Sequence, residues 1–401
     1  MRTTWSFFTA GQIVFGPGSV NQLGELADRH SLRRIFLVTD ATLQNLGIVE
    51  RAKTPLENAG CEVEVFAEGK AEPPIETAVD AIAAAREYRP DAILGLGGGS
   101  NMDLAKFVAA GVAHAGQPSD FFGFDRVPGP VAPIIAVPTT SGTGSEVSHA
   151  AVLTDTANEM KVSMLSNYLR PNIAVVDPEL TYSCPKQVAA DSGIDALTHA
   201  IEAYTAVDYT MMEEGLANKT AYEGRFPLGE TIAEKAISLV AKNLVDAVND
   251  PDNLVARNEM ALASTLAGIA FSNCGVALVH ALEYPLGGAL HCSHGGGNGL
   301  LLPFVMKFNL PERIPAFARI AKLLGCNVSG LADEDAAVAA IQAVEQLKID
   351  IGIPLNIREL GGKQDQLPGF AEKAFALERL RLINPRPATL NDFIAIYEDA
   401  F

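Results

Sequence analysis

The stretch that decides the fold is Ala92-Ile93-Leu94-Gly95-Leu96-Gly97-Gly98-Gly99-Ser100-Asn101-Met102-Asp103. Its apolar beginning predicts a buried strand, and the residues after the glycines predict the start of a helix. The bare backbone amides of Gly98, Gly99 and Ser100, together with the helix N-terminus, favour a bound phosphate group. A tight strand-to-helix turn without any ligand needs glycines of the same kind. The stretch therefore predicts a strand, a turn and a helix, with a candidate phosphate cradle at the turn.

Similar apolar runs on both sides of this stretch alternate with helical patterns, as in residues 75–88. This alternation predicts a mainly parallel sheet covered by helices. After Pro185 the pattern changes to long stretches of helical period, so the rest of the chain is expected to be all α. We therefore expect an α/β dinucleotide-binding domain over residues 1–184 and a helical metal-binding domain over residues 185–401, with an inserted loop at 208–229. The expected strands are 34–39, 61–66, 92–96, 133–137 and 173–177, and the expected long helices include 230–248 and 258–270.

Composition limits the class of ligand and the compartment. The chain has 401 residues, 48% of them hydrophobic, and a formal net charge of −18. Nucleic acids and anionic membranes are recognised through basic surfaces, so neither is expected as a partner, and a small-molecule substrate fits better. Five cysteines without a Cys-x-x-Cys spacing indicate neither a disulfide framework nor a cysteine zinc site. With no targeting segment or membrane span in the sequence, we expect a cytoplasmic protein, and we expect it to form a homo-oligomer.

A second polar turn, Pro138-Thr139-Thr140-Ser141-Gly142-Thr143-Gly144-Ser145-Glu146, also follows an apolar run. Its hydroxyls and amides suit a pyrophosphate or a nicotinamide amide. The first turn does not match the usual dinucleotide fingerprint, because Ser100 stands where the last glycine belongs, and no P-loop Lys-Ser or Lys-Thr follows it. Two polar turns at the ends of neighbouring strands nevertheless suit a dinucleotide better than either turn alone.

Asp40 ends the run 34–39, where its carboxylate could accept hydrogen bonds from the ribose hydroxyls of the adenosine. A carboxylate at this point would repel a 2′-phosphate and so favour NAD over NADP. Aspartate is also a preferred helix N-cap, and capping of the segment 41–46 explains Asp40 equally well. Unlike the acidic residue of the Rossmann pattern, Asp40 precedes the glycine turn.

Four residues form a candidate site for one divalent metal: Asp195 and His199, and later His280 and His294. Asp195 and His199 are four residues apart in a helix-favouring stretch, so both side chains project from one face of the helix. One carboxylate with three imidazoles suits Zn(II) or Fe(II) and leaves coordination positions open for a substrate oxygen. An Asp and a His at this spacing are also common as an ordinary surface pair or a satisfied buried pair.

These motifs together resemble the iron-containing, or group III, alcohol dehydrogenases, from about Phe15 to Pro387. The motifs that carry the resemblance are Gly97-Gly98-Gly99-Ser100-x-x-Asp103-x-x-Lys106, Pro138-Thr139-Thr140-x-Gly142-Thr143-Gly144-Ser145-Glu146, Asp177-Pro178-Glu179, Asp195-x-x-x-His199-x-x-Glu202, His280 with His294-Gly295, and Asn384-Pro385-Arg386-Pro387.

The resemblance implies an enzyme that interconverts an alcohol and an aldehyde or ketone with NAD(H), with a metal activating the substrate oxygen for hydride transfer. It implies that Fe(II) is the native ion, although Zn(II) or Ni(II) could occupy the same site. The metal ligands that it implies are Asp195, His199, His280 and His294. The residues that it places around NAD are Asp40, Gly98, Gly99, Ser100, Asp103, Thr139, Thr140, Thr143 and Lys161.

Tyr284 departs from the family pattern, because many members carry a histidine four residues after the third metal ligand. A phenol is a poor base near neutral pH, so Tyr284 and His291 are both candidates for the proton-transfer group. Glu202 is a candidate for orienting a ligand imidazole, or else a plain surface carboxylate.

Tyr284-Pro285 and the loop at 208–229 are similar to the hydroxyacid-oxoacid transhydrogenase branch, which makes a transhydrogenase acting on 4-hydroxybutyrate-like substrates the alternative function. A lyase related to dehydroquinate synthase is disfavoured, because the C-terminal half lacks a basic cluster for its substrate.

Overall fold

The computed structural model describes residues 2–158, 160–212 and 221–401. The chain divides at Pro185 into two compact units. The α/β unit comprises Phe8–Cys184, and the helical unit comprises Pro185–Phe401 together with Met1–Phe7. Arg2 forms an ion pair with Glu223, and the ring of Trp5 stacks on Phe226 with 4.5 Å between centroids. The first seven residues, which sequence analysis placed in the α/β domain, therefore group with the helical unit.

The α/β unit is built on a six-stranded sheet with the order β1-β9-β6-β4-β2-β3, and every neighbouring pair of strands is parallel. The predicted mainly parallel sheet is thus confirmed. Five of its strands correspond to the five predicted runs, whereas β1 was not predicted. The strands are β1 (Gln12–Phe15), β2 (Arg34–Asp40), β3 (Glu62–Gly69), β4 (Ala92–Gly97), β6 (Ile134–Pro138) and β9 (Ile173–Val176).

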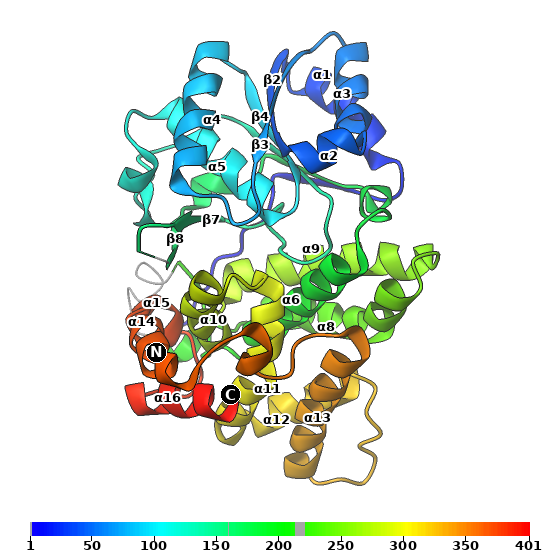
Figure 1. Ribbon diagram of the computed structural model, residues 1–401. Coiled ribbons are helices and arrows are strands. Elements are labelled where there is room, and N and C mark those ends of the chain that lie inside the picture. Colours follow the sequence, from blue (N-terminus) through cyan, green and yellow to red (C-terminus); the bar gives the residue numbers. More distant parts are fainter. Residues whose placement is uncertain (1, 159, 213–220) are drawn as a thin grey trace. The chain divides into compact units, whose positions relative to one another are not determined.

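Alternate residues of each strand point to opposite faces of the sheet, and both faces are covered. Phe36 and Val38 of β2 pack into a core with α4 and α5, whereas Ile35 and Leu37 pack into a second core with α1 and α3. In Figure 1 these helix pairs lie on opposite sides of the strands. The sheet is therefore the middle layer of a three-layer unit. Its helices are α1 (Leu23–Arg29), α2 (Ala41–Asn45), α3 (Ile48–Asn58), α4 (Ile75–Tyr88) and α5 (Gly99–Ala113).

A smaller sheet with the order β5-β8-β7 lies in the same unit. Strands β7 (Ala150–Asp155) and β8 (Met160–Leu165) pair antiparallel, and β5 (Gly123–Phe124) pairs with β8. The sequence analysis did not predict this sheet. Strands β7 and β8 follow the second polar turn, and β8 carries the predicted cofactor residue Lys161.

The helical unit has helices and 3-10 turns but no strand of a sheet among its described residues, which confirms the all-α prediction. Its hydrophobic core extends from Ala190 to Ala400 and includes fully buried Phe317 and Phe393. The helices are α6 (Lys186–Thr205), α8 (Pro227–Asn249), α9 (Leu254–Cys274), α10 (Leu278–Leu290), α11 (His294–Asn309), α12 (Ile314–Leu323), α13 (Asp333–Ile351), α14 (Leu367–Phe375), α15 (Glu378–Arg381) and α16 (Leu390–Asp399).

The predicted loop at 208–229 falls partly outside the described residues, which omit 213–220. In its described part a bridge joins Asp208 to Arg225, and α8 begins at Pro227, so the last three residues of the predicted loop are helical. No single described helix is long and apolar enough to cross a membrane. Helices α9 and α10 pass that test only together, as a pair bent by 106°.

Candidate metal centre and nucleotide-binding turns

Three helices of the helical unit carry the predicted metal ligands. Asp195 and His199 lie on α6, His280 lies on α10, and His294 is the first residue of α11. Asp195, His199 and His280 are at most 4% exposed, and the side chain of His294 is 27% exposed. Small residues allow this close packing, because a Cβ at Gly295 would lie 2.0 Å from the carbonyl oxygen of Asp191 on α6.

Asp195, His280 and His294 each offer one donor atom, and the three donor atoms lie within 4.8 Å of one another. His199 lies beside this group, with its Nδ1 3.8 Å from Asp195 Oδ2 and its ring 4.8 Å from the His280 ring between centroids. The structure thus brings together three of the four predicted ligands and places the fourth next to them. This donor set, a carboxylate and imidazoles, suits a divalent transition metal.

Two buried glutamates hold the imidazoles in one orientation. Glu202 on α6 accepts a hydrogen bond from His280 Nδ1 at 2.6 Å, and Glu283 on α10 accepts one from His294 Nδ1 at 2.5 Å. With Nδ1–H directed to a carboxylate, each ring keeps the lone pair of its Nε2 for another partner. Glu202 therefore orients the candidate ligand His280. The sequence analysis proposed that Glu202 orients a ligand imidazole, and the structure shows that this imidazole lies on a neighbouring helix. Glu283 was not singled out from the sequence.

The amide of Asn298 occupies the point on which the three donor atoms converge. Its Nδ2 donates to Asp195 Oδ1 at 2.8 Å and lies 3.2 Å from Nε2 of both His280 and His294. Asn298 is fully buried on α11, one helical turn after His294. Acceptor atoms of three side chains thus meet at one electropositive group, which is the chemistry that a bound cation requires. The residues present therefore fit a metal ion.

The electrostatics of Asp195 agree with this arrangement. Burial acts to raise the pKa of its carboxyl, but His199, His294, His280 and the Asn298 amide outweigh burial and hold the pKa below its ordinary value. Asp195 therefore stays ionised at neutral pH. An ionised carboxylate among imidazoles is the form in which it ligates a metal.

The two candidates for proton transfer lie in different surroundings. Tyr284 is 6% exposed on α10, one turn after His280, and its ring centroid lies 6.2 Å from that of His294. His291 is exposed at the C-terminal end of α10, in the left-handed conformation with φ of 55°. The structure thus places Tyr284, rather than His291, against the candidate ligands.

Most of the predicted nucleotide-binding residues lie at or just after the carboxyl ends of β2, β4 and β6 in the α/β unit. Chain order is β2, β3, β4, β6, β9, whereas the spatial order is β3-β2-β4-β6-β9, so the order reverses between β2 and β4. In open parallel sheets, ligands bind at this point of reversal. Asp40 ends β2 and Gly97 ends β4, and a hydrogen bond from Asn101 Nδ2 to Asp40 Oδ2 at 2.7 Å links the two ends.

Asp40 also has the capping role that the sequence left open. Its Oδ1 accepts hydrogen bonds from the backbone amides of Thr42 at 2.9 Å and Leu43 at 3.0 Å, at the start of α2. One carboxylate oxygen therefore caps the helix, and the other accepts from Asn101. The side chain is fixed at the switch point of the sheet.

The two polar turns touch each other. A Cβ at Gly99 would lie 2.8 Å from Thr143 Cγ2, and a Cβ at Gly98 would lie 3.5 Å from the Thr140 hydroxyl. Thr139 follows β6, and its amide donates to the carbonyl of Gly97 at 2.9 Å. Close approach requires glycine at position 99, because a side chain there would push the turns apart. The structure thus brings both turns to one edge of the sheet.

The remaining cofactor candidates differ in their surroundings. Ser100 Oγ accepts from the amide of Glu72 at 3.2 Å, and Glu72 lies 3.2 Å from Lys161 Nζ, so Ser100 and Lys161 lie on either side of Glu72. Asp103 instead accepts from Ser145 Oγ at 2.6 Å and from the Val152 amide at 2.9 Å. Asp103 therefore joins α5 to the second turn and to β7.

Lys106, one turn after Asp103 on α5, supports the same joint. It is fully buried, and its Nζ donates to Ser145 Oγ at 2.8 Å, to Ser148 Oγ at 3.1 Å and to the carbonyl of Ala150 at 2.7 Å. Burial lowers the pKa of Lys106 to about 8. Lys106 thus packs the second polar turn against α5.

Comparison with known proteins identifies the family. The model of the iron-containing alcohol dehydrogenases matches residues 10–178, and the model of the C-terminal region of Fe-containing alcohol dehydrogenases matches residues 224–401. The chain belongs to the iron-containing alcohol dehydrogenase family. These matches confirm the resemblance seen in the sequence and the fold of an α/β part and a helical part. They also confirm the predicted class, an NAD-dependent alcohol dehydrogenase of the iron type.

Known members of the family align with this chain over nearly its full length. The long-chain-alcohol dehydrogenase 1 of Geobacillus thermodenitrificans (strain NG80-2) is 37% identical over 98% of this chain and 97% of its own. The NAD-dependent methanol dehydrogenase of Bacillus methanolicus is 34% identical over 98% and 99%. A crystal structure of 1,3-propanediol oxidoreductase superposes with a TM-score of 0.93 at 36% identity, covering 100% of both chains.

The transhydrogenase alternative receives less support. The mitochondrial hydroxyacid-oxoacid transhydrogenase of Mus musculus is 32% identical over 96% of this chain and 88% of its own, which is below the identities of the dehydrogenases above. Both Tyr284-Pro285 and the loop at 208–229 suggested this branch. The dehydrogenase function is therefore the one that the comparisons favour for this alcohol dehydrogenase.

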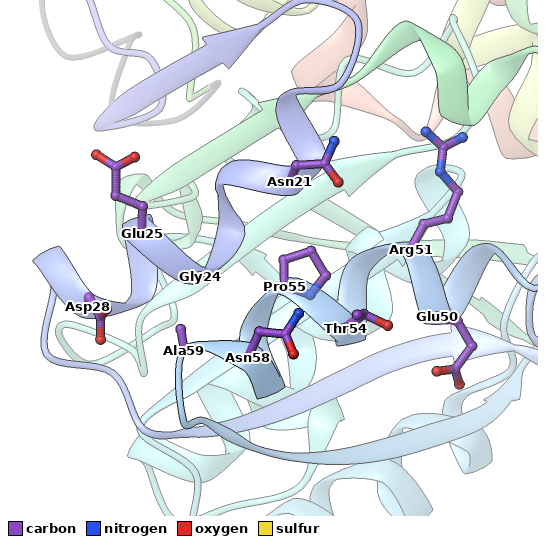
Figure 2. Close-up of a pocket in the computed structure, with 10 residues that line it drawn as sticks. All are labelled: Asn21, Gly24, Glu25, Asp28, Glu50, Arg51, Thr54, Pro55, Asn58 and Ala59. Atoms are coloured by element: carbon purple, nitrogen blue, oxygen red, sulfur yellow. The ribbon is translucent and has the colours of Figure 1, made fainter.

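An open groove of the α/β unit lies between α1 and α3, and none of the residues predicted for either site lines it (Figure 2). The helices cross closely there, because a Cβ at Gly24 would lie 2.3 Å from the carbonyl oxygen of Pro55. Arg51 on its rim forms an ion pair with Glu179 at 2.6 Å. The groove has no part in the chemistry described above.

Proposed function

We propose that this alcohol dehydrogenase oxidises a small alcohol, and reduces the corresponding carbonyl compound, at one divalent ion held by Asp195, His199, His280 and His294. The observation that carries the proposal is the convergence of three donor atoms within 4.8 Å, with two imidazoles oriented by buried carboxylates. Oriented ligands of this kind are typical of functional metal sites.

Fe(II) is the proposed native ion. One carboxylate and three imidazoles also suit Zn(II) and Ni(II), and general affinity order favours those ions over iron, so occupancy by iron depends on metal availability. When bound, the ion supplies Lewis acidity that lowers the pKa of an alcohol hydroxyl and polarises a carbonyl. Asp195 contributes a negative charge at this centre, and Glu202 and Glu283 strengthen the donor character of His280 and His294.

The proposed NAD site is the switch point of the sheet, between β2 and β4. Asp40, Gly98, Gly99, Ser100, Thr139, Thr140, Thr143 and Lys161 are the proposed contacts, with Asp103 holding the second turn in place. The amides of the glycine turn and the start of α5 suit the pyrophosphate, and Asp40 suits a ribose hydroxyl. Because Asp40 is fixed by α2 and Asn101, its carboxylate would stay near an incoming 2′-phosphate and disfavour NADP.

Proton transfer is proposed to involve Tyr284 rather than His291. Tyr284 lies against His294, whereas His291 is exposed at the end of α10. The net charge of −18 supports a small-molecule substrate rather than a nucleic acid or an anionic membrane. A homo-oligomeric, cytoplasmic enzyme remains part of the proposal.

The test is removal of one ligand. His280→Ala should lose bound metal and nearly all NAD-dependent oxidation, with its fold intact by circular dichroism, because most packing is untouched. His30→Ala is the matched control, since His30 is exposed on the α/β unit. Metal content is measured by elemental analysis of protein reconstituted with Fe(II). A metal-replete, active His280→Ala variant would refute the ligand assignment.

A further inference from the structure

A second polar cluster of the helical unit, here called the arginine cluster, lies beside the candidate metal ligands. It consists of Arg379 on α15, Tyr222 before α8, and Tyr284 on α10. Arg379 Nη1 donates to Tyr222 Oη at 3.3 Å, and the guanidinium carbon lies 5.9 Å from the centroid of the Tyr222 ring. Tyr284 is also hydrogen-bonded to Arg379. Two phenols therefore hold one guanidinium group.

The arginine cluster adjoins the metal centre through Tyr284. Tyr284 is one turn after His280, and its ring centroid is 6.2 Å from that of His294. Tyr284 therefore lies between the candidate ligand His294 and the guanidinium of Arg379.

The arginine cluster is rigidly built. Tyr222 is 2% exposed, and it follows Ala221, whose φ of 66° is unusual for a residue with a side chain. A Cβ at Gly275 would lie 3.1 Å from the Tyr222 ring, and Gly275 itself has φ of 115°, so glycine is required there. The backbone on both sides is thus shaped around this tyrosine, which in turn holds Arg379.

The arginine cluster carries a positive charge at neutral pH. Burial acts to lower the pKa of Arg379, but Tyr222 and Tyr284 outweigh it and the pKa is raised above its ordinary value. Burial raises the pKa of Tyr222 to about 12, so this phenol stays neutral. An oriented guanidinium in a partly dry site is a strong receptor for a planar carboxylate, to which it can donate two parallel hydrogen bonds.

We propose that Arg379 binds the carboxylate of a hydroxy-acid substrate whose alcohol oxygen lies at the metal centre, which rests on the function proposed above. Tyr222 and Tyr284 act as positioning residues that hold the guanidinium. The substrate class is then an alcohol with a carboxylate at its other end, rather than a simple alkyl alcohol. A purely structural role, in which Arg379 only balances the buried charges of Glu202 and Glu283, predicts no dependence on the carboxylate.

The experiment compares two matched substrates, 4-hydroxybutyrate and 1-butanol, with metal-loaded enzyme and added NAD. Wild type should show a higher kcat/KM for 4-hydroxybutyrate. Arg379→Gln should lower that value by about 10- to 100-fold, mainly through KM, because a charge-assisted hydrogen bond to a group remote from the reacting carbon is lost. The value for 1-butanol should change by less than about threefold. Arg381→Gln is the matched control, since Arg381 lies on the same helix with its guanidinium carbon 4.2 Å from the Phe375 ring centroid.

A second readout does not depend on turnover. Butyrate, which has the carboxylate but no hydroxyl, should bind to wild type and to Arg381→Gln in calorimetry, and binding should weaken at least tenfold in Arg379→Gln. Tyr222→Phe should weaken it less, because the guanidinium remains but loses one of its two holding hydrogen bonds.

The outcomes separate this inference from the function on which it rests. The inference would be overturned if Arg379→Gln lowered kcat/KM equally for both substrates, or if wild type had no preference for 4-hydroxybutyrate. The proposed alcohol dehydrogenase function would still stand. If metal-loaded wild type oxidised neither substrate, nor any alcohol of a wider panel, the proposed function itself would fail and the inference with it.

Discussion

Glu202 on α6 and His280 on α10 are 78 residues apart in sequence and share a hydrogen bond of 2.6 Å between Oε2 and Nδ1. The other oxygen of Glu202 accepts from the amide of Val279 at 2.7 Å, at the start of α10. One carboxylate thus fixes both the beginning of the helix and the tautomer of its histidine. This hydrogen bond orients the proposed ligand His280 for a metal ion.

The same logic predicts the effect of Glu283→Gln. The change removes the negative charge that holds His294 Nδ1, so metal affinity should fall by about 10- to 100-fold. Chelator competition measures the affinity. Glu372→Gln, an exposed carboxylate on α14, is the control. Unchanged affinity in Glu283→Gln would mean that His294 is not a ligand or that its orientation is held by other contacts.

Two substitutions of Asp40 separate its proposed role in cofactor choice from its role as the N-cap of α2. Asp40→Asn keeps a good N-cap for α2 but removes the charge, so the ratio of kcat/KM for NADP over NAD should rise about tenfold with little loss of stability. Asp40→Ala also removes the cap and should lower the free energy of unfolding by about 1 kcal/mol. Steady-state kinetics with both cofactors and urea denaturation check these values. If the cofactor ratio stays constant in Asp40→Asn, Asp40 is a cap only.

Tyr284→His tests the departure from the commoner family pattern. An imidazole one turn after His280 introduces a group that titrates near neutral pH, so the pH profile of kcat should gain an inflection between about pH 5 and 8. Metal content should stay the same. Tyr284→Phe, which removes the hydroxyl and adds no titratable group, should show no such inflection. An identical profile in both variants would place Tyr284 outside the proton path.

The burial of Lys348 on α13 predicts that the free energy of unfolding depends on pH. Lys348 is 2% exposed, its Nζ donates to the carbonyl of Leu300 at 2.9 Å, and burial lowers its pKa from 10.5 to about 8. Between these two values the unfolded chain binds more protons than the folded chain, so the contribution of Lys348 to stability rises with pH in this window. Below about pH 8 the folded protein carries the full cost of a buried charge.

Lys348→Met should therefore raise the free energy of unfolding at pH 7 by about 2 kcal/mol, since the desolvation cost exceeds the hydrogen bond that is lost. The difference from wild type should shrink as the pH rises from 8 toward 10.5. Urea denaturation at several pH values measures it. Lys322→Met, an exposed lysine on α12, is the control. A destabilised Lys348→Met variant at pH 7 would show that the hydrogen bond outweighs the burial of the charge.

The sequence by itself determined the features that depend on local periodicity. Apolar runs followed by polar turns predicted five strands of the parallel sheet, because a strand buried on both faces has no polar alternation. The helix 75–88 was predicted with the bounds of α4, Ile75–Tyr88. The short strands β1, β7 and β8 were missed, since their side chains are only partly buried and their pattern is weak.

For the candidate site, sequence spacing placed Asp195 and His199 on one face of a helix, because side chains four residues apart lie one turn apart. His280 and His294 come from other stretches of the sequence, and the family resemblance implied all four residues as ligands. The pairing of His280 with Glu202, the convergence on Asn298 and the approach of Arg379 to Tyr284 were decided only by the tertiary structure. Helix packing sets these contacts, and residues far apart in sequence carry no periodicity that reports which helices will meet.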